Sequence, residues 1–100
     1  MIRTIMVVDD DPRVLERMRN LLENENLNVT TARTNKEAIE ILEREKSIGA
    51  ILLRARMPDG RDVFIPFIRR DDKTLPLDME MPRNCSRSEL VRFVSELTSL

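Results

Sequence analysis

The chain has 100 residues, of which 17 are basic and 18 acidic, so its formal net charge is −1. This length predicts a single domain spanning residues 1–100, and 41% hydrophobic against 35% charged residues is typical of a folded globular chain. The near-zero charge and only 3 aromatic residues argue against a nucleic-acid-binding module. With no histidine and a single cysteine, Cys85, the chain lacks the residues for histidine-based catalysis, an all-cysteine zinc site or an intrachain disulfide.

The sequence shows no sign of membrane insertion or secretion. No apolar run approaches the ~20 residues that cross a bilayer. The N-terminus lacks the charged-then-apolar pattern of a secretory signal. We therefore expect a cytoplasmic protein without membrane contact.

The first part of the chain predicts a strand, a helix and a second strand. Residues 2–8 form a nearly continuous, β-branched apolar run, which is typical of a strand covered on both faces. Three aspartates follow at residues 9–11, and the last of them, Asp11, is predicted to cap a helix that begins at Pro12. Apolar residues then recur at helical spacing as far as Leu22. Residues 28–32 are expected to form a short strand.

A second helix and a third strand follow. Thr34 and Glu37 fit a capping box, and Gly49 interrupts the apolar pattern after this helix. The residues predicted to be buried in the helix are Ala38, Ile39 and Leu42. Residues 50–53 (Ala-Ile-Leu-Leu) predict another buried strand.

The next segment is expected to begin with a turn at residues 57–60 (Met-Pro-Asp-Gly) and to continue as a helix over Asp62–Arg70. Pro66 lies inside this predicted helix and removes a backbone donor, so a kink or a short 3₁₀ piece is expected there. Residues 74–81 predict a poor strand interrupted by Pro76.

The last element is predicted to be a helix opened by a capping box of Ser86 and Glu89. Its predicted buried residues are Leu90, Val91, Val94 and Leu97. The resulting alternation of strands and helices implies an α/β protein with a parallel sheet and helices on both faces.

Acidic residues follow the first strand. Open α/β sheets bind ligands at the carboxyl ends of their strands. Asp9 and Asp10 lie at such an end, and paired carboxylates there are suited to Mg²⁺. The alternative is that these two residues only end the strand while Asp11 caps the helix.

Several segments together resemble the receiver domain of bacterial response regulators. They are residues 5–12 (Ile-Met-Val-Val-Asp-Asp-Asp-Pro), the capped helix after Ala32, residues 51–53 and the Met-Pro-Asp-Gly turn at residues 57–60. The resemblance extends from Met1 to about Arg70 and resumes over residues 81–97. It implies a flavodoxin-like, doubly wound parallel sheet.

The resemblance also assigns positions to the chemistry of the family. The acidic pair that holds Mg²⁺ in receivers matches Asp9 and Asp10. The phosphate-accepting aspartate lies four residues before the proline of the Met-Pro turn, where this chain has Arg54, and the family's lysine precedes a proline where this chain has Met81. A guanidinium stays protonated and has no nucleophilic oxygen, so these matches predict a degenerate, aspartate-less receiver without a bound metal. No counterpart of the switching Ser or Thr is found. Asp59, in the turn, is an unfavoured substitute acceptor.

The chain is also shorter than the ~120 residues usual in receivers, a size within the single-domain range. We therefore expect one strand and the fourth helix to be missing. The loss of a helix is expected to expose apolar surface, and such surface commonly marks an interface.

Arg54 has a predicted structural role of its own. From the neighbouring strand its guanidinium is expected to reach Asp9 and Asp10 and to replace the metal as their counter-ion. The alternative is that Arg54 points into solvent. Arg56 is expected to be exposed.

These observations predict a non-phosphorylatable receiver-like module of a two-component-type pathway that acts through protein–protein interaction. The expected partner is a kinase, an output domain, another regulator or a second copy of the chain. Neither enzymatic activity nor a cofactor is expected. The alternative is a small-molecule or anion-binding flavodoxin-like module that uses Asp9, Arg54 and the loop of residues 57–61.

Overall fold

The first half of the chain forms a parallel sheet with intervening helices. The computed structural model describes residues 2–100 and contains, in this half, β1 (Thr4–Val8), α1 (Pro12–Glu23), β2 (Asn28–Ala32), α2 (Asn35–Arg44) and β3 (Ala50–Arg56). β1 lies between β2 and β3 and pairs with both in parallel. This arrangement confirms the predicted α/β class and the flavodoxin-like order of these strands.

The predicted helix caps of this half are formed, with one change. Asp11 accepts a hydrogen bond from the Arg13 N–H at 2.9 Å. Thr34 Oγ1 accepts one from the Glu37 N–H at 3.0 Å. The Glu37 carboxylate, however, accepts from the N–H of Arg33 at 2.8 Å rather than from Thr34. The second helix therefore begins as predicted, but its capping box closes one residue earlier.

The predicted helix over Asp62–Arg70 is wrong, because this segment is β4, a strand antiparallel to β3. A tight turn joins the two strands: the Gly60 N–H donates to the Met57 carbonyl at 2.8 Å, and Gly60 has a φ of 91°, which glycine adopts without strain. The apolar residues of β4 are aromatic or β-branched, types that favour a pleated strand. Because these side chains meet apolar partners along β3, pairing in the sheet overrides the weak helical spacing.

Pro66 is accommodated within β4. The Pro66 carbonyl is on the side of β5 (Lys73–Pro76), and it accepts from the N–H of Leu77, the residue after that strand, at 3.0 Å. In an antiparallel strand the N–H and C=O of one residue point to the same side. The missing N–H of Pro66 therefore faces away from β3 and costs no hydrogen bond in the main hairpin.

The poor strand predicted over residues 74–81 is divided in two. β5 pairs with the C-terminal part of β4, and β6 (Met81–Pro82) pairs with its N-terminal part, both antiparallel. The sheet is therefore mixed, and the parallel pairing predicted for the whole sheet holds only for β2-β1-β3. Within the described residues no helix lies between β3 and α3 (Arg87–Thr98), so the fold is a shortened flavodoxin-like α/β arrangement.

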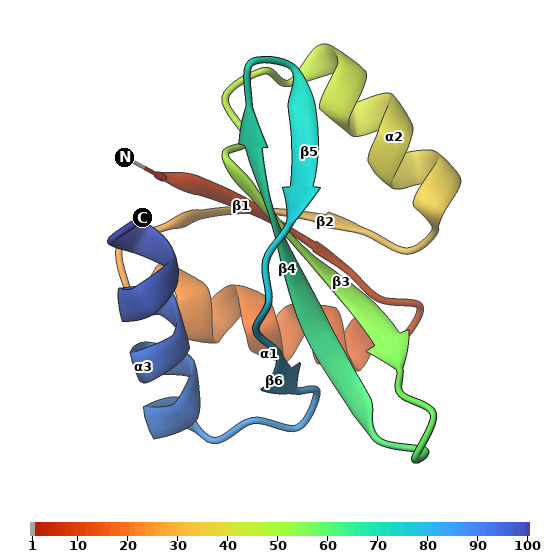
Figure 1. Cartoon of the computed structure of the whole chain (residues 1–100), viewed down its shortest axis with the longest axis vertical. Coiled ribbons are helices and arrows are strands. Elements are labelled where there is room, and N and C mark those ends of the chain that lie inside the picture. Colours follow the sequence, from red (N-terminus) through yellow and green to blue (C-terminus); the bar gives the residue numbers. More distant parts are fainter. Residues whose placement is uncertain (1) are drawn as a thin grey trace.

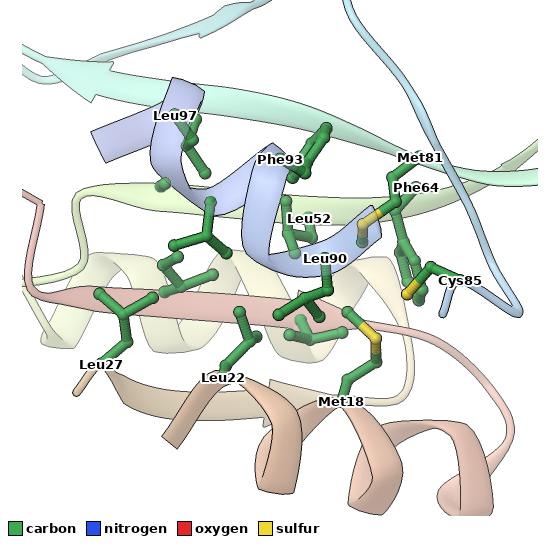
Figure 2. Packing of buried hydrophobic residues seen from close by; sticks show 14 of the residues in the cluster. Met18, Leu22, Leu27, Leu52, Phe64, Met81, Cys85, Leu90, Phe93 and Leu97 are labelled. Atoms are coloured by element: carbon green, nitrogen blue, oxygen red, sulfur yellow. The ribbon is translucent and has the colours of Figure 1, made fainter. Parts of the chain in front are cut away.

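Helices cover both faces of the sheet, as predicted. α1 and α3 pack on one face and enclose the larger core cluster, while α2 lies on the opposite face (Figure 1). Figure 2 shows Met18 and Leu22 of α1 and Leu90 and Leu97 of α3 gathered with Leu52 of the sheet in this cluster. Ser86 and Glu89 form the predicted capping box at the start of α3.

Two predicted core residues lie outside the core. Ile39 is 57% exposed and Val91 is 38% exposed, whereas Ile41 and Phe93 are buried. The other predicted core residues are confirmed: Ala38, Leu90, Val94 and Leu97 are buried and Leu42 is half-buried, so the buried face of each helix is only slightly shifted from the predicted one. Within the described residues, no helix combines the length and apolarity that a membrane span requires.

Part of the sheet on the α2 side carries half-exposed apolar side chains. Leu53 pairs with Ile65, and Ile51 pairs with Phe67. Leu53 and Phe67 pack against the cluster beneath α2, and paired residues share a face, so Ile65 lies on this face too. α2 packs mainly over β1 and β2, and Leu53, Ile65 and Phe67 are half-buried. We call these three residues the open apolar face.

Candidate functional site

Asp9 is the buried centre of the candidate site at the carboxyl end of β1. It is 2% exposed, and its N–H continues the β1–β2 pairing by donating to the Ala32 carbonyl at 3.1 Å. Arg83 donates to both carboxylate oxygens, from Nε to Oδ2 at 2.8 Å and from Nη2 to Oδ1 at 2.6 Å. The N–H of Asp11 adds a third hydrogen bond to Oδ1 at 2.9 Å. Both oxygens of Asp9 thus accept hydrogen bonds from the protein itself.

These contacts determine the charge of Asp9. Burial by itself raises the pKa of this carboxyl group. The hydrogen bonds from Arg83 and from the Asp11 N–H, with the positive charge of Arg83, outweigh burial and hold the pKa below its ordinary value. The same pairing raises the pKa of Arg83. Asp9 and Arg83 therefore form a charged, doubly hydrogen-bonded pair at neutral pH.

Asp10 and Arg54 lie beside this pair. Asp10 is exposed, and its Oδ1 lies 3.5 Å from Arg83 Nη2 and 3.7 Å from Arg54 Nη1. Arg54, in β3, also donates from Nη2 to Asp62 Oδ1 at 3.2 Å. Its Nε is buried without a hydrogen-bond partner. Arg54 therefore bridges the acidic end of β1 and the start of β4.

Asp62 completes the network. Arg56 Nε lies 3.4 Å from the same Asp62 oxygen that Arg54 contacts. The hydrogen bond from Arg56, together with the charges of Arg56 and Arg54, holds the pKa of Asp62 below its ordinary value. As predicted, Arg56 is exposed, at 67% of its side chain. Three carboxylates (Asp9, Asp10, Asp62) thus face three guanidiniums (Arg54, Arg56, Arg83), and we call these six residues the ion-pair network.

The hypothesis that Arg54 is the counter-ion of both aspartates is corrected by this geometry. Arg54 reaches Asp10 but hydrogen-bonds to Asp62, while the cation on Asp9 is Arg83. The physical reason is that residues 62–70 form a strand instead of the predicted helix. The strand places Asp62 opposite Arg56 and diagonal to Arg54, within reach of the Arg54 guanidinium. The alternative that Arg54 points freely into solvent is also wrong, since it is 28% exposed.

The sequence analysis does not predict Arg83 as a site residue, because it treats residues 74–81 as one poor strand and does not separate β6. Met81, which the resemblance aligns with the family's lysine, is 2% exposed and packs in the larger core cluster. Residues two apart on an extended chain point to the same side. A cation two positions after Met81 is the signal that would have found Arg83.

The loop that carries Arg83 is held at several points. The Arg83 N–H donates to the Asp62 carbonyl at 3.0 Å, which extends the β4–β6 pairing. Arg17 of α1 donates to the Cys85 carbonyl and lies 3.9 Å from its sulfur. Cys85 is buried, and burial raises the pKa of its thiol. The arginine on Asp9 is therefore fixed from both sides of the loop.

The residues present do not fit the Mg²⁺ that the receiver resemblance implies. The Asp9 oxygens are occupied by Arg83, and the neighbouring Asp10 faces two guanidiniums. No cluster of three or more metal-ligating side chains occurs among residues 2–100. Positive charge already fills the position of a metal ion.

A shallow hollow of about 450 Å³ adjoins the network and is lined by Arg61, Asp62, Val63, Pro82, Arg83 and Asn84. Its two cations are already paired, Arg83 with Asp9, and Arg61 with Asp59 and Glu80 at 2.8 Å each. The hydrogen bond from Arg61 holds the pKa of Asp59 below its ordinary value. The hollow offers an anion no unpaired cation among its lining residues, and Arg61 holds Asp59 in the hairpin turn.

Comparisons with known proteins identify the family of the chain. A family profile of the response regulator receiver domain matches residues 5–79. A stretch of 41 residues is 51% identical to the uncharacterized 14.6 kDa protein in the sodA1 3'region of Leptolyngbya boryana, covering 41% of this chain and 31% of that protein. No solved structure matches the chain. Because the receiver profile covers more than half of the sequence, the chain belongs to the response regulator receiver domain family.

Proposed function

We propose that this receiver domain, whose family acts in two-component-type signalling, is not phosphorylated and works in the cytoplasm through protein–protein contacts. The observation that carries the proposal is the ion-pair network. In this network Arg54, the residue that the sequence resemblance aligns with the acceptor aspartate, donates to Asp62, and both oxygens of Asp9 accept from Arg83.

The chemistry of an acyl phosphate supports the absence of phosphorylation. Formation of the mixed anhydride needs a carboxylate oxygen that is free to attack phosphorus and a cation that holds the donor phosphate. Arg54 has no oxygen to attack with and stays protonated at physiological pH. Asp9 is a carboxylate, but its oxygens accept three hydrogen bonds and are shielded by burial. We therefore propose that the domain has no enzymatic activity.

The open apolar face supports the second part of the proposal. Leu53, Ile65 and Phe67 lie on the sheet face from which a helix is missing, and each is half-buried. Burial of such side chains on association is favourable by roughly 25 cal/mol per Å² of apolar surface. A kinase, an output domain, another regulator or a second copy of the chain are the partner classes that suit a receiver domain.

Phosphorylation is tested by treating the protein with acetyl phosphate and Mg²⁺ and measuring its intact mass. We expect no gain of a phosphate, while a receiver domain with an acceptor aspartate, treated in parallel, gains one. A stable phosphate on this chain that maps to Asp9, Asp10 or Asp59 would overturn the proposal.

A further inference from the structure

The family's metal and the ion-pair network compete for the same carboxylates. Asp9 is buried and its side chain is fully shielded from solvent, so an uncompensated charge there would be costly. In this chain the compensation comes from Arg83, whose side chain is 21% exposed and whose fork matches the carboxylate at 2.8 and 2.6 Å. The cation of the site is thus covalently part of the chain.

We infer that Arg83 is the built-in replacement for the divalent metal, and that it keeps a latent cation site at Asp9 and Asp10 closed. Arg83 also lies 3.5 Å from Asp10, so one guanidinium contacts both carboxylates that a metal would contact. This inference does not depend on whether the domain binds a protein partner.

Local charge supports the inference. The network contains three carboxylates and three guanidiniums, so its net charge is zero and it exerts little attraction on a dication. Removal of Arg83 leaves one uncompensated negative charge and frees two buried oxygens on Asp9. Asp10 is exposed beside them, so a metal and its retained waters have access from solvent.

Arg83 also ties the C-terminal part of the fold to β1. The loop of residues 83–86 leads directly into α3, and within the described residues Arg83 is the side chain of this loop that pairs with the end of β1. A metal ion would neutralise Asp9 without making this connection. The replacement of metal by arginine therefore couples the acidic end of β1 to the position of α3 permanently.

The test measures divalent-cation binding by the intact chain and by variants of Arg83. Arg83→Gln keeps a hydrogen-bond donor and removes the charge, and Arg83→Ala removes both. The matched control is Arg61→Ala, because Arg61 lines the same hollow but pairs with Asp59 and Glu80 and makes no hydrogen bond to Asp9. Melting curves are recorded in millimolar Mg²⁺ against NaCl of equal ionic strength, and Mn²⁺ binding is followed by electron paramagnetic resonance.

We expect the wild type and Arg61→Ala to show no Mg²⁺-specific change in Tm. Both Arg83 variants should melt lower without metal, regain part of the loss in Mg²⁺, and bind Mn²⁺ about tenfold or more tightly than the wild type, because a repelling charge in direct contact is removed. Adding Asp9→Asn to Arg83→Gln should abolish this gain. If a variant is unfolded without metal, recovery of the fold on adding Mn²⁺ supports the inference.

Two results would overturn it. One is a Mg²⁺-specific stabilisation of the wild type, which would show that the site is open despite Arg83. The other is that the Arg83 variants gain no affinity for Mn²⁺, whether or not they are folded without metal. Arg83 would then be only a structural ion-pair partner of Asp9.

Discussion

The two halves of the sheet differ in strand pairing and in how far their strands are buried. Strands β1 to β3 pair in parallel, and β1 is buried along nearly its whole length between α2 on one face and α1 and α3 on the other. β4 to β6 pair antiparallel, and β5 is exposed at all four residues. The first half keeps the receiver pattern, whereas the second half replaces a helical crossover with a hairpin.

The difference shows how a short chain closes a flavodoxin-like sheet. A parallel strand after β3 needs a crossover of a dozen or more residues, while an antiparallel strand needs only a tight turn. The turn at residues 57–60 supplies that shorter route. The hairpin affects the two faces of β4 differently. The face toward α1 and α3 remains in the core, whereas no helix within the described residues covers β4 on the side of α2.

The largest effect is expected from the two faces of β4. Phe64→Ala should lower the free energy of unfolding by about 3–5 kcal/mol, because Phe64 is fully buried in the larger core cluster. Phe67→Ala, three positions along the same strand, should cost only about 1–2 kcal/mol, because Phe67 is half-exposed. Urea unfolding of both variants measures the difference. Equal costs for the two would contradict the assignment of an open face.

A smaller loss, ~3 kcal/mol at neutral pH, is expected for Asp9→Asn, because it leaves Arg83 without its partner in a partly buried pair. The pKa of Asp9 is lowered in the fold, so its stabilisation is complete above the unfolded value near 3.9 and is lost as pH falls through the lower folded value. The stability gap between wild type and variant should therefore close in strong acid. Thermal melting from pH 7 down to pH 2 checks this, and a gap that persists undiminished would rule out the charged pair as its source.

Ile65→Lys on the open apolar face is expected to change stability least. It should instead change the association of the protein. Its stability should stay within about 1 kcal/mol of the wild type, because the side chain is half-exposed. Sedimentation velocity at micromolar concentrations should show self-association of the wild type and a monomer for the variant. Ile39→Lys, on the outer side of α2 where Ile39 is 57% exposed, is the control and should associate like the wild type. A monomeric wild type would exclude a second copy as the occupant of this face.

Local patterns in the sequence predicted the first half of the fold well. Apolar runs, Asp11 before Pro12, and Thr34 before the second helix determine where β1, α1 and α2 begin, because caps and buried runs act within a few residues. Burial along the helices was less predictable. Ile39 and Ile41 are equally apolar, and only the rotation of α2 on the sheet decides that Ile41 is inside.

The second half was decided by tertiary structure. Asp62–Arg70 contains apolar residues compatible with either helix or strand, and the partner strand β3 selected the strand. The site has both kinds of contribution. The sequence predicted that Asp9, Asp10 and Arg54 lie near one another, since β1 and β3 are adjacent in the parallel half. The pairing of Asp9 with Arg83 joins residues 74 positions apart. That pairing depends on β6 lying against β4, and the short spacing from Met81 to Arg83 does not by itself indicate Asp9 as the partner.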